Sequence, residues 1–272
     1  GFAGQYVAEV TLDLDSERRV IASQTSLHET SQTSPSQAVR EVMEPELSQG
    51  VAWLNQVLGE EPLLPVTHDA FEARIYGHPY IEFLNQLQLR ETGADFSAIA
   101  LVNEAFKDFH GPITNEILLA SYPYYNLIAT VEVSGQTIKD ALEFDLNYLV
   151  LDQAGRKAIN PSYIAPKPKH YNFYVFSGLM TTVDLTQPVG QRVVSIVDER
   201  KGQELDLDAT YTLALTKYRA CGGGGYHMFS SDQMKTLSKT DLATLMKEAL
   251  AHFDPEDWEQ INNHYQHFTW LQ

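Results

Sequence analysis

Two short segments place aromatic rings beside the ends of predicted strands, where a flat ligand can be held. The first runs from Lys217 to Tyr226 and has Tyr218 shortly before four consecutive glycines, Gly222–Gly225. Because glycine has no side chain, it lets a ligand or another segment approach the main chain closely. We therefore expect a surface on which a planar ligand lies against main chain, with the Tyr218 ring as one wall. Glycine-rich runs are also common in ordinary loops, which is the alternative for this segment.

The second segment, 121–126, reads Ser-Tyr-Pro-Tyr-Tyr-Asn and lies directly before a predicted strand over 127–133. Pro123 restricts the backbone, and Tyr124 and Tyr125 can present a ring at the strand edge. Tyrosines beside a strand most often pack in a core or at its rim, so ligand contact has a structural alternative here too. Two aromatic loops can, however, hold a planar base between them, and stacking contributes about 1–3 kcal/mol per base. Together they predict a nucleoside site that needs no strongly charged surface.

Other catalytic patterns are sparse in this chain. Asp108 and His110 have the Asp-x-His spacing with which a two-metal site can begin, but no further ligand motif of a dinuclear phosphatase follows them. Asn263, His264 and His267 lack the following glutamate that a phosphatase motif needs, and we interpret them as a solvated tail segment. The sequence contains neither His-Glu-x-x-His nor Gly-x-Ser-x-Gly.

Composition narrows the class of protein. The 272 residues include 19 Lys plus Arg and 36 Asp plus Glu, a net charge of −17, which argues against a nucleic-acid backbone as the main partner. The only cysteine, Cys221, excludes an intrachain disulfide, and with Arg219 as its only basic neighbour we interpret it as incidental. No apolar run approaches the about 20 residues that cross a membrane. The opening residues resemble the middle of a protein, so we expect a fragment of a longer precursor.

Hydrophobic periodicity predicts two parts. Residues 1–60 contain a hairpin over 6–22 and a helix over about 36–58, preceded by a Ser-Pro cap, disturbed at Pro45 and ended by Gly59. We interpret this part as the tail of a preceding domain plus a helical linker. Residues 61–272 form the second domain.

The second domain is predicted to be α+β, a mixed sheet with packed helices. Helices are expected around 80–92, ended by Gly93, over 137–149, and from Asp241 onward. Strands are expected over 97–101, 127–133, 171–176, 182–185, 192–197 and 210–216.

Several segments together resemble the C-terminal domain of the 5′-nucleotidase family. The resemblance extends over about 65–253 and is carried by Gly111–Ile117, Tyr122–Asn126, Val131–Lys139, Tyr171–Val193 and Tyr218–Tyr226.

The resemblance implies a nucleoside held between two aromatic rings. Tyr124 and Tyr218 match those rings, Asn126 matches a polar residue beside the first, and Gly222 and Gly223 match a glycine pair in the substrate-facing loop. Arg219, next to Tyr218, is our further candidate for substrate contact or for stacking behind the clamp.

The resemblance also implies a partner: an N-terminal metallophosphatase domain that carries two divalent metal ions and hydrolyses the phosphoester, while this fragment needs no cofactor of its own. An extracellular, cell-wall-associated or periplasmic bacterial enzyme is expected, with a nucleoside or nucleotide as substrate and no membrane span.

Departures from the family pattern point to one branch. The Asn-x-Gly-Gly-Ile-Arg motif of typical 5′-nucleotidases is missing from 100–107, and Gly224 stands where they carry an aspartate for the ribose. With tyrosine rings, the chain looks more like the 2′,3′-cyclic-nucleotide 2′-phosphodiesterase/3′-nucleotidase branch. Two alternatives stay open: a stand-alone binding module for another small ligand, such as a peptide or sugar, and an independent hydrolase built around Asp108 and His110.

Overall fold

The computed structural model describes residues 4–60, 63, 66, 68–104, 106 and 111–271. The chain forms two compact units, Gly1–Trp53 and Leu54–Gln272, and each is described by itself.

The first unit consists of a hairpin and most of a helix. Strands β1 (Tyr6–Leu14) and β2 (Val20–Glu29) pair antiparallel, as predicted, and the helix α1 covers Gln37–Leu54. The helix continues through Pro45 and ends before the predicted limit of 58. It ends early because residues 57–59 pair with another strand and so take an extended conformation.

None of the described residues of this first unit is buried. Apolar side chains are exposed along both the hairpin and α1: Tyr6, Val7, Val10, Leu12, Leu14, Val20, Ile21, Leu27, Val39, Val42, Met43, Leu47, Val51 and Trp53. A two-stranded hairpin is at best marginally stable alone in water, and exposed apolar patches of this kind mark contact surfaces.

The second unit contains seven helices within the described residues. They are α2 (Ala70–Tyr76), α3 (Pro79–Thr92), α4 (Asn115–Ser121), α5 (Gly135–Leu146), α6 (Lys217–Ala220), α7 (Leu242–His252) and α8 (Pro255–Asn263).

Its strands form a five-stranded sheet, a four-stranded sheet and two small pairs. The five-stranded sheet contains β4 (Phe96–Ala100), β6 (Leu127–Ser134), β9 (Tyr174–Ser177), β13 (Thr210–Thr216) and β14 (Met234–Asp241). The four-stranded sheet contains β10 (Leu179–Val183), β11 (Val193–Asp198), β12 (Gln203–Glu204) and β15 (Phe268–Trp270). The pairs are β3 (Val57–Gly59) with β5 (Ile113–Thr114), and β7 (Leu149–Leu151) with β8 (Lys157–Ile159).

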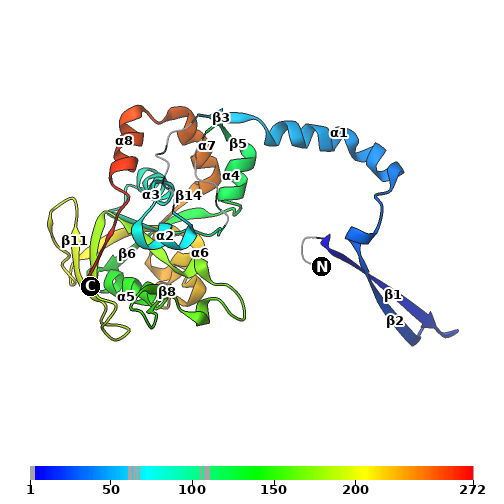
Figure 1. The fold of residues 1–272 in the computed structure, drawn as a ribbon, viewed down its shortest axis with the longest axis horizontal. Helices are drawn as coiled ribbons and strands as arrows, with labels where there is room; N and C mark the ends of the chain where they lie inside the picture. Colours follow the sequence, from blue (N-terminus) through cyan, green and yellow to red (C-terminus); the bar gives the residue numbers. More distant parts are fainter. Residues whose placement is uncertain are drawn as a thin grey trace. The chain divides into compact units, whose positions relative to one another are not determined.

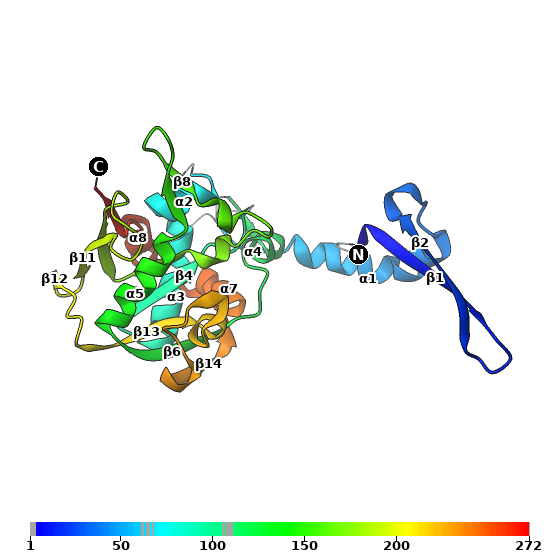
Figure 2. The ribbon, with the colours of Figure 1, turned by 90° about the horizontal axis from the view of Figure 1, so that it is seen from below.

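The five-stranded sheet has the order β14-β6-β13-β4-β9 and is mixed. Only β13 and β4 are parallel; the other neighbours are antiparallel. Every residue of β4 is buried, and β6 and β13 are buried on both faces over most of their length. Burial on both faces requires cover on both faces. Helix α3 packs on this sheet, α7 contacts α3 and β14, and α8 packs on α3. Helix α5 contacts both β6 and β11, so that it links the two sheets (Figures 1 and 2).

The local signals explain why these elements form where they do. Asp69 caps α2 in a capping box, Ser134 caps α5, and Asp241 caps α7, each by accepting backbone N–H groups at the first turn. Helix α3 ends at Gly93, whose φ of 66° is the left-handed conformation that favours glycine. The predicted α+β class is confirmed.

The C-terminal segment corrects one prediction. His267 is not in a solvated tail but is only 3% exposed, and its Nε2 lies 2.8 Å from Glu82 Oε2. Glu199 lies 3.7 Å from its Nδ1, and β15, which follows, pairs parallel with β10. A histidine between two carboxylates can be buried because its charge is paired there, and sequence periodicity does not show such a pairing.

Candidate functional site

Four strand ends meet at one edge of the five-stranded sheet. In the antiparallel pair β6–β13, Ile128 lies opposite Thr216, so the segment before β6 and the segment after β13 are neighbours. The parallel strand β4 ends at the same edge, where Ala100 pairs with Tyr174 at the start of β9. Ligands of sheets flanked by helices commonly bind outside the carboxyl ends of the parallel strands, and this edge contains both of them.

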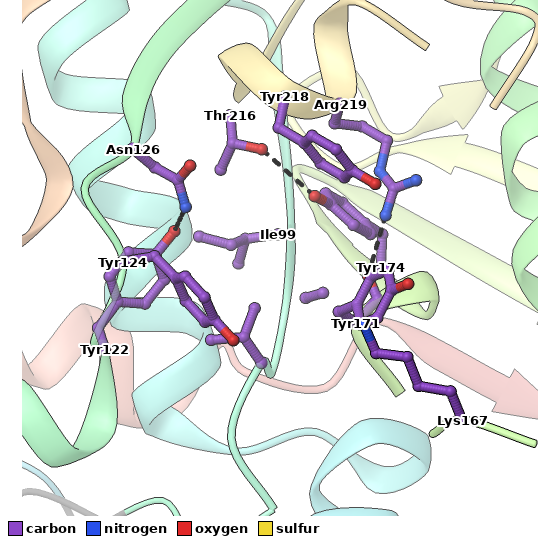
Figure 3. A pocket seen from close by; sticks show the side chains of 12 residues that line it. Ile99, Tyr122, Tyr124, Asn126, Lys167, Tyr171, Tyr174, Thr216, Tyr218 and Arg219 are labelled. Atoms are coloured by element: carbon purple, nitrogen blue, oxygen red, sulfur yellow. Dashed lines mark hydrogen bonds between the residues drawn. The ribbon is translucent and has the colours of Figure 1, made fainter. Parts of the chain in front are cut away.

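A pocket of about 360 Å³ lies at this edge (Figure 3). It is lined by Ile99, Ala100, Val102, Tyr122, Tyr124, Asn126, Lys167, Tyr171, Tyr174, Thr216, Tyr218 and Arg219. Aliphatic and aromatic side chains dominate this lining, with a few polar groups between them, as in sites for small organic ligands.

The two predicted rings both line this pocket. The Tyr124 and Tyr218 side chains come from different segments and extend toward the same hollow in Figure 3. Tyr124 is 53% exposed and Tyr218 is 52% exposed, so both rings offer surface to a ligand. Such half-exposed phenols are suited to stacking on a planar ring.

The first ring packs against the buried side chain of Tyr122. Tyr122 packs edge-on against Tyr124 with ring centroids 6.4 Å apart, and burial raises the pKa of the Tyr122 phenol. Asn126 Nδ2 donates a hydrogen bond of 2.8 Å to the Tyr122 hydroxyl. The amide oxygen of Asn126 has no donor among the described residues, so it is available to a donor on a ligand edge.

The glycine run supports the second ring. A Cβ added at Gly223 would lie 2.6 Å from two atoms of the Tyr218 ring and 2.5 Å from the Tyr218 carbonyl oxygen. Gly222 has a φ of 80°, a conformation that other residues rarely adopt. The glycines therefore allow Tyr218 to fold back over the loop; that Gly222 and Gly223 also face a substrate stays a prediction. Gly223 and Tyr218 together line a neighbouring hollow.

Arg219 lies beneath this loop and is fully buried. Its Nη1 donates to the Gly223 carbonyl at 2.5 Å, and its Nη2 donates to the Tyr171 carbonyl at 2.9 Å and to Asn172 Oδ1 at 3.1 Å. The guanidinium also lies 3.5 Å from the centroid of the Tyr226 ring. These contacts tie the glycine loop to the start of β9, and they direct the cation of Arg219 toward the protein.

A buried carboxyl completes the support. Asp145 accepts hydrogen bonds from the Tyr226 hydroxyl and, at 3.1 Å, from the Tyr174 main chain. Burial raises the pKa of Asp145 well above its ordinary value, although the Arg219 charge opposes that rise. This network fixes the wall behind the pocket.

Several lining residues were missed by the sequence analysis. Tyr174 and Thr216 lie at strand ends, and their hydroxyl oxygens are 3.4 Å apart. Register between strands would have located both, but register is not visible in one sequence. Lys167 carried no signal at all, because it lies in an irregular segment.

The metal-site hypothesis receives no support from the described residues. Asp108 and His110 lie outside them. Elsewhere in the described chain, no three His, Cys, Asp or Glu side chains gather as metal ligands would. Among the same residues, no helix combines the length and the apolar character needed to span a membrane.

Comparison with known proteins defines the class. The family model described as 5′-nucleotidase, C-terminal domain, matches residues 50–231, which is more than half of the chain. The chain therefore belongs to the 5′-nucleotidase C-terminal domain family.

Particular relatives are nucleotide phosphoesterases. Over 126 residues the chain is 26% identical to the trifunctional nucleotide phosphoesterase protein YfkN of Bacillus subtilis. This match covers 42% of this chain and 8% of YfkN. A Staphylococcus aureus protein assigned as a 5′-nucleotidase, solved in complex with alpha-ketoglutarate, is 25% identical with a TM-score of 0.80, covering 99% of this chain and 51% of its own. A 5′-nucleotidase precursor from Thermus thermophilus shares the fold at 20% identity and a TM-score of 0.62, over 99% of this chain and 50% of its own. The chain thus spans about half of these solved relatives and a small part of YfkN.

Proposed function

We propose that this chain is the nucleoside-binding part of a metal-dependent 2′,3′-cyclic-nucleotide 2′-phosphodiesterase/3′-nucleotidase. The observation that carries the proposal is that the Tyr124 and Tyr218 rings, 94 residues apart in the sequence, line one pocket and are both half exposed. A purine stacked between them would gain about 1–3 kcal/mol from each ring.

In this proposal, the chain positions the substrate. The rings bind the base, Asn126 and Thr216 offer hydrogen-bonding groups to its edge, and Arg219 holds the loop that carries Tyr218. Fixing the base restricts the approach of the phosphoester to the catalytic groups, and such orientation accounts for a large part of many rate enhancements.

The catalytic groups themselves are proposed to lie on an N-terminal metallophosphatase domain, which would hold two divalent ions that polarise the phosphoester and activate water. The first unit supports this partner, because its hairpin and α1 expose apolar side chains with no core of their own. The division between domains is proposed near residue 60, with residues 1–60 as tail and linker and 61–272 as the nucleoside-binding domain. The Thermus relative is a precursor, which supports the proposal of an extracellular, cell-wall-associated or periplasmic enzyme.

A calorimetric titration of the chain with adenosine tests the stacking. We expect Tyr124→Ala and Tyr218→Ala each to weaken binding by about 5- to 150-fold, the loss of one stacking contact. Tyr125→Ala is the matched control, because Tyr125 is 76% exposed in the same loop and does not line the pocket. Unchanged affinity in both ring variants would refute the proposal. So would hydrolysis of 3′-AMP by the isolated chain, if that activity persists in Tyr218→Ala.

A stand-alone module for a small ligand is the second candidate. The observation in its favour is that the Staphylococcus aureus relative was solved with alpha-ketoglutarate. Titration with alpha-ketoglutarate and with an oligosaccharide under the same conditions separates the two functions. Tighter binding of either compound than of adenosine would favour the module.

A further inference from the structure

The residues that line the nucleoside pocket differ in charge from the rest of this acidic chain. The net charge is −17, yet no Asp or Glu is among the twelve residues that line the pocket. Two lining residues, Arg219 and Lys167, are cationic. The two terminal nitrogens of Arg219, Nη1 and Nη2, donate to main-chain and amide oxygens of the protein, so they are already engaged internally.

Lys167 differs from Arg219 in its exposure and in its contacts. It is exposed, and Figure 3 shows its side chain running from the rim into the pocket. Within the described part of the chain, its ammonium has neither an ion-pair nor a hydrogen-bond partner, whereas Lys201 and Lys235 are paired with Asp198 and Glu132. Proline on each side of Lys167 restricts the backbone that presents it.

We propose that Lys167 determines specificity by contacting the phosphate of a nucleotide whose base lies between Tyr124 and Tyr218. This inference rests on the proposed function and adds the anion contact to it. An ammonium on a flexible stem offers three donors and can follow a phosphate at more than one position on the ribose. Its contact with a phosphate oxygen is a charge-assisted hydrogen bond, which is stronger than a neutral one.

The test compares the affinity of the chain for adenosine and for 3′-AMP by calorimetry at low ionic strength. We expect the unaltered chain to bind 3′-AMP about tenfold more tightly than adenosine, a difference of about 1.4 kcal/mol. Lys167→Gln should weaken 3′-AMP binding about tenfold more than it weakens adenosine binding and so remove this preference, and Lys167→Arg should keep most of it. The preference should also shrink in 1 M salt, because the contact is exposed.

Lys169→Gln is the matched control, because Lys169 is an exposed lysine two residues away that does not line the pocket. Equal affinities for the two ligands in the unaltered chain, or the same loss of preference in Lys169→Gln, would overturn the assignment of Lys167. So would a Lys167→Gln variant that loses adenosine and 3′-AMP affinity equally. If adenosine binds and Tyr218→Ala abolishes its binding, any of these three outcomes refutes only the assignment of Lys167 and leaves the proposed function standing. If neither ligand binds, both proposals fail.

Discussion

Gly223→Ala gives the sharpest test of how the second ring is held. Gly223 is not among the residues with positive φ, so alanine meets no backbone penalty there, and the available space alone decides the effect. The new Cβ would lie 2.6 Å from the Tyr218 ring and 2.5 Å from its carbonyl oxygen, whereas ordinary contacts are 3.4–4 Å. The ring therefore has to move by about 0.8 Å, and the main chain has to move with it.

We expect this displacement to remove most of the stacking by Tyr218. The loss of one stacking contact corresponds to an adenosine affinity about 5- to 150-fold weaker. Overpacking of this kind should also lower the free energy of unfolding by about 1–3 kcal/mol. Calorimetry measures the first quantity and urea unfolding the second.

Gly50→Ala is the control for the substitution itself. Gly50 lies in α1, and an added Cβ there would meet nothing within 4 Å. Adenosine affinity should not change in this variant. If Gly223→Ala bound adenosine as tightly as the unaltered chain, the contact between the glycine loop and Tyr218 would have no part in binding, and the argument for that loop would be refuted.

Two further predictions concern the buried charges. Burial alone lowers the pKa of His267, but the neighbouring carboxylates of Glu199 and Glu82 outweigh it and raise that pKa to about 9. A pKa that is raised on folding stabilises the protein at pH values below the ordinary histidine pKa of about 6.5, and this stabilisation, about 3 kcal/mol here, is lost as the pH rises through 9. Urea unfolding at a series of pH values should show this loss in the unaltered chain and a flatter dependence on pH in His267→Gln. Parallel dependences in the two proteins would contradict the prediction. In Arg219→Lys, the lysine cannot reach all three acceptors of the arginine, so the free energy of unfolding should fall by about 2–4 kcal/mol. Arg200→Lys, at an exposed site, should change it by less than about 0.5 kcal/mol. Equal effects of the two substitutions would show that the buried hydrogen bonds of Arg219 are unimportant for stability.

The elements with strong local signals were predictable from the sequence. Helix α3 has its apolar residues at helical spacing and a glycine at its end, and β6 and β13 are short apolar runs next to turns. Helix α8 was missed because its apolar face is short, although Asp254 and Asp257 form a capping box and Pro255 lies in the first turn. Strand β10 begins at Leu179 rather than Thr182, since its bounds depend on pairing with β11 and β15.

The candidate site was predictable only in part, for a similar reason. Tyr124 and Tyr218 stand out because each lies in a loop with unusual composition. The pairing of Arg219 with main-chain oxygens and the position of Lys167 depend on segments far apart in the sequence, and so does the burial of His267 elsewhere in the fold. A single sequence records propensities of neighbours along the chain, and such long-range pairings leave no periodic trace in it.

The register between β6 and β13 has a consequence for discrimination among bases. Tyr124 lies just before β6 and Tyr218 just after β13, so one hydrogen-bonded ladder, with Ile128 opposite Thr216, positions both rings; a slip of that ladder by one residue would exchange side chains between two buried faces. The positions from which the two phenols extend are therefore resistant to gradual change, and in the proposed function the phenols would stack on the flat ring system that all nucleobases share. Preference for one base over another should then evolve through hydrogen-bonding groups of the pocket, such as the Asn126 amide, without any change in the sheet.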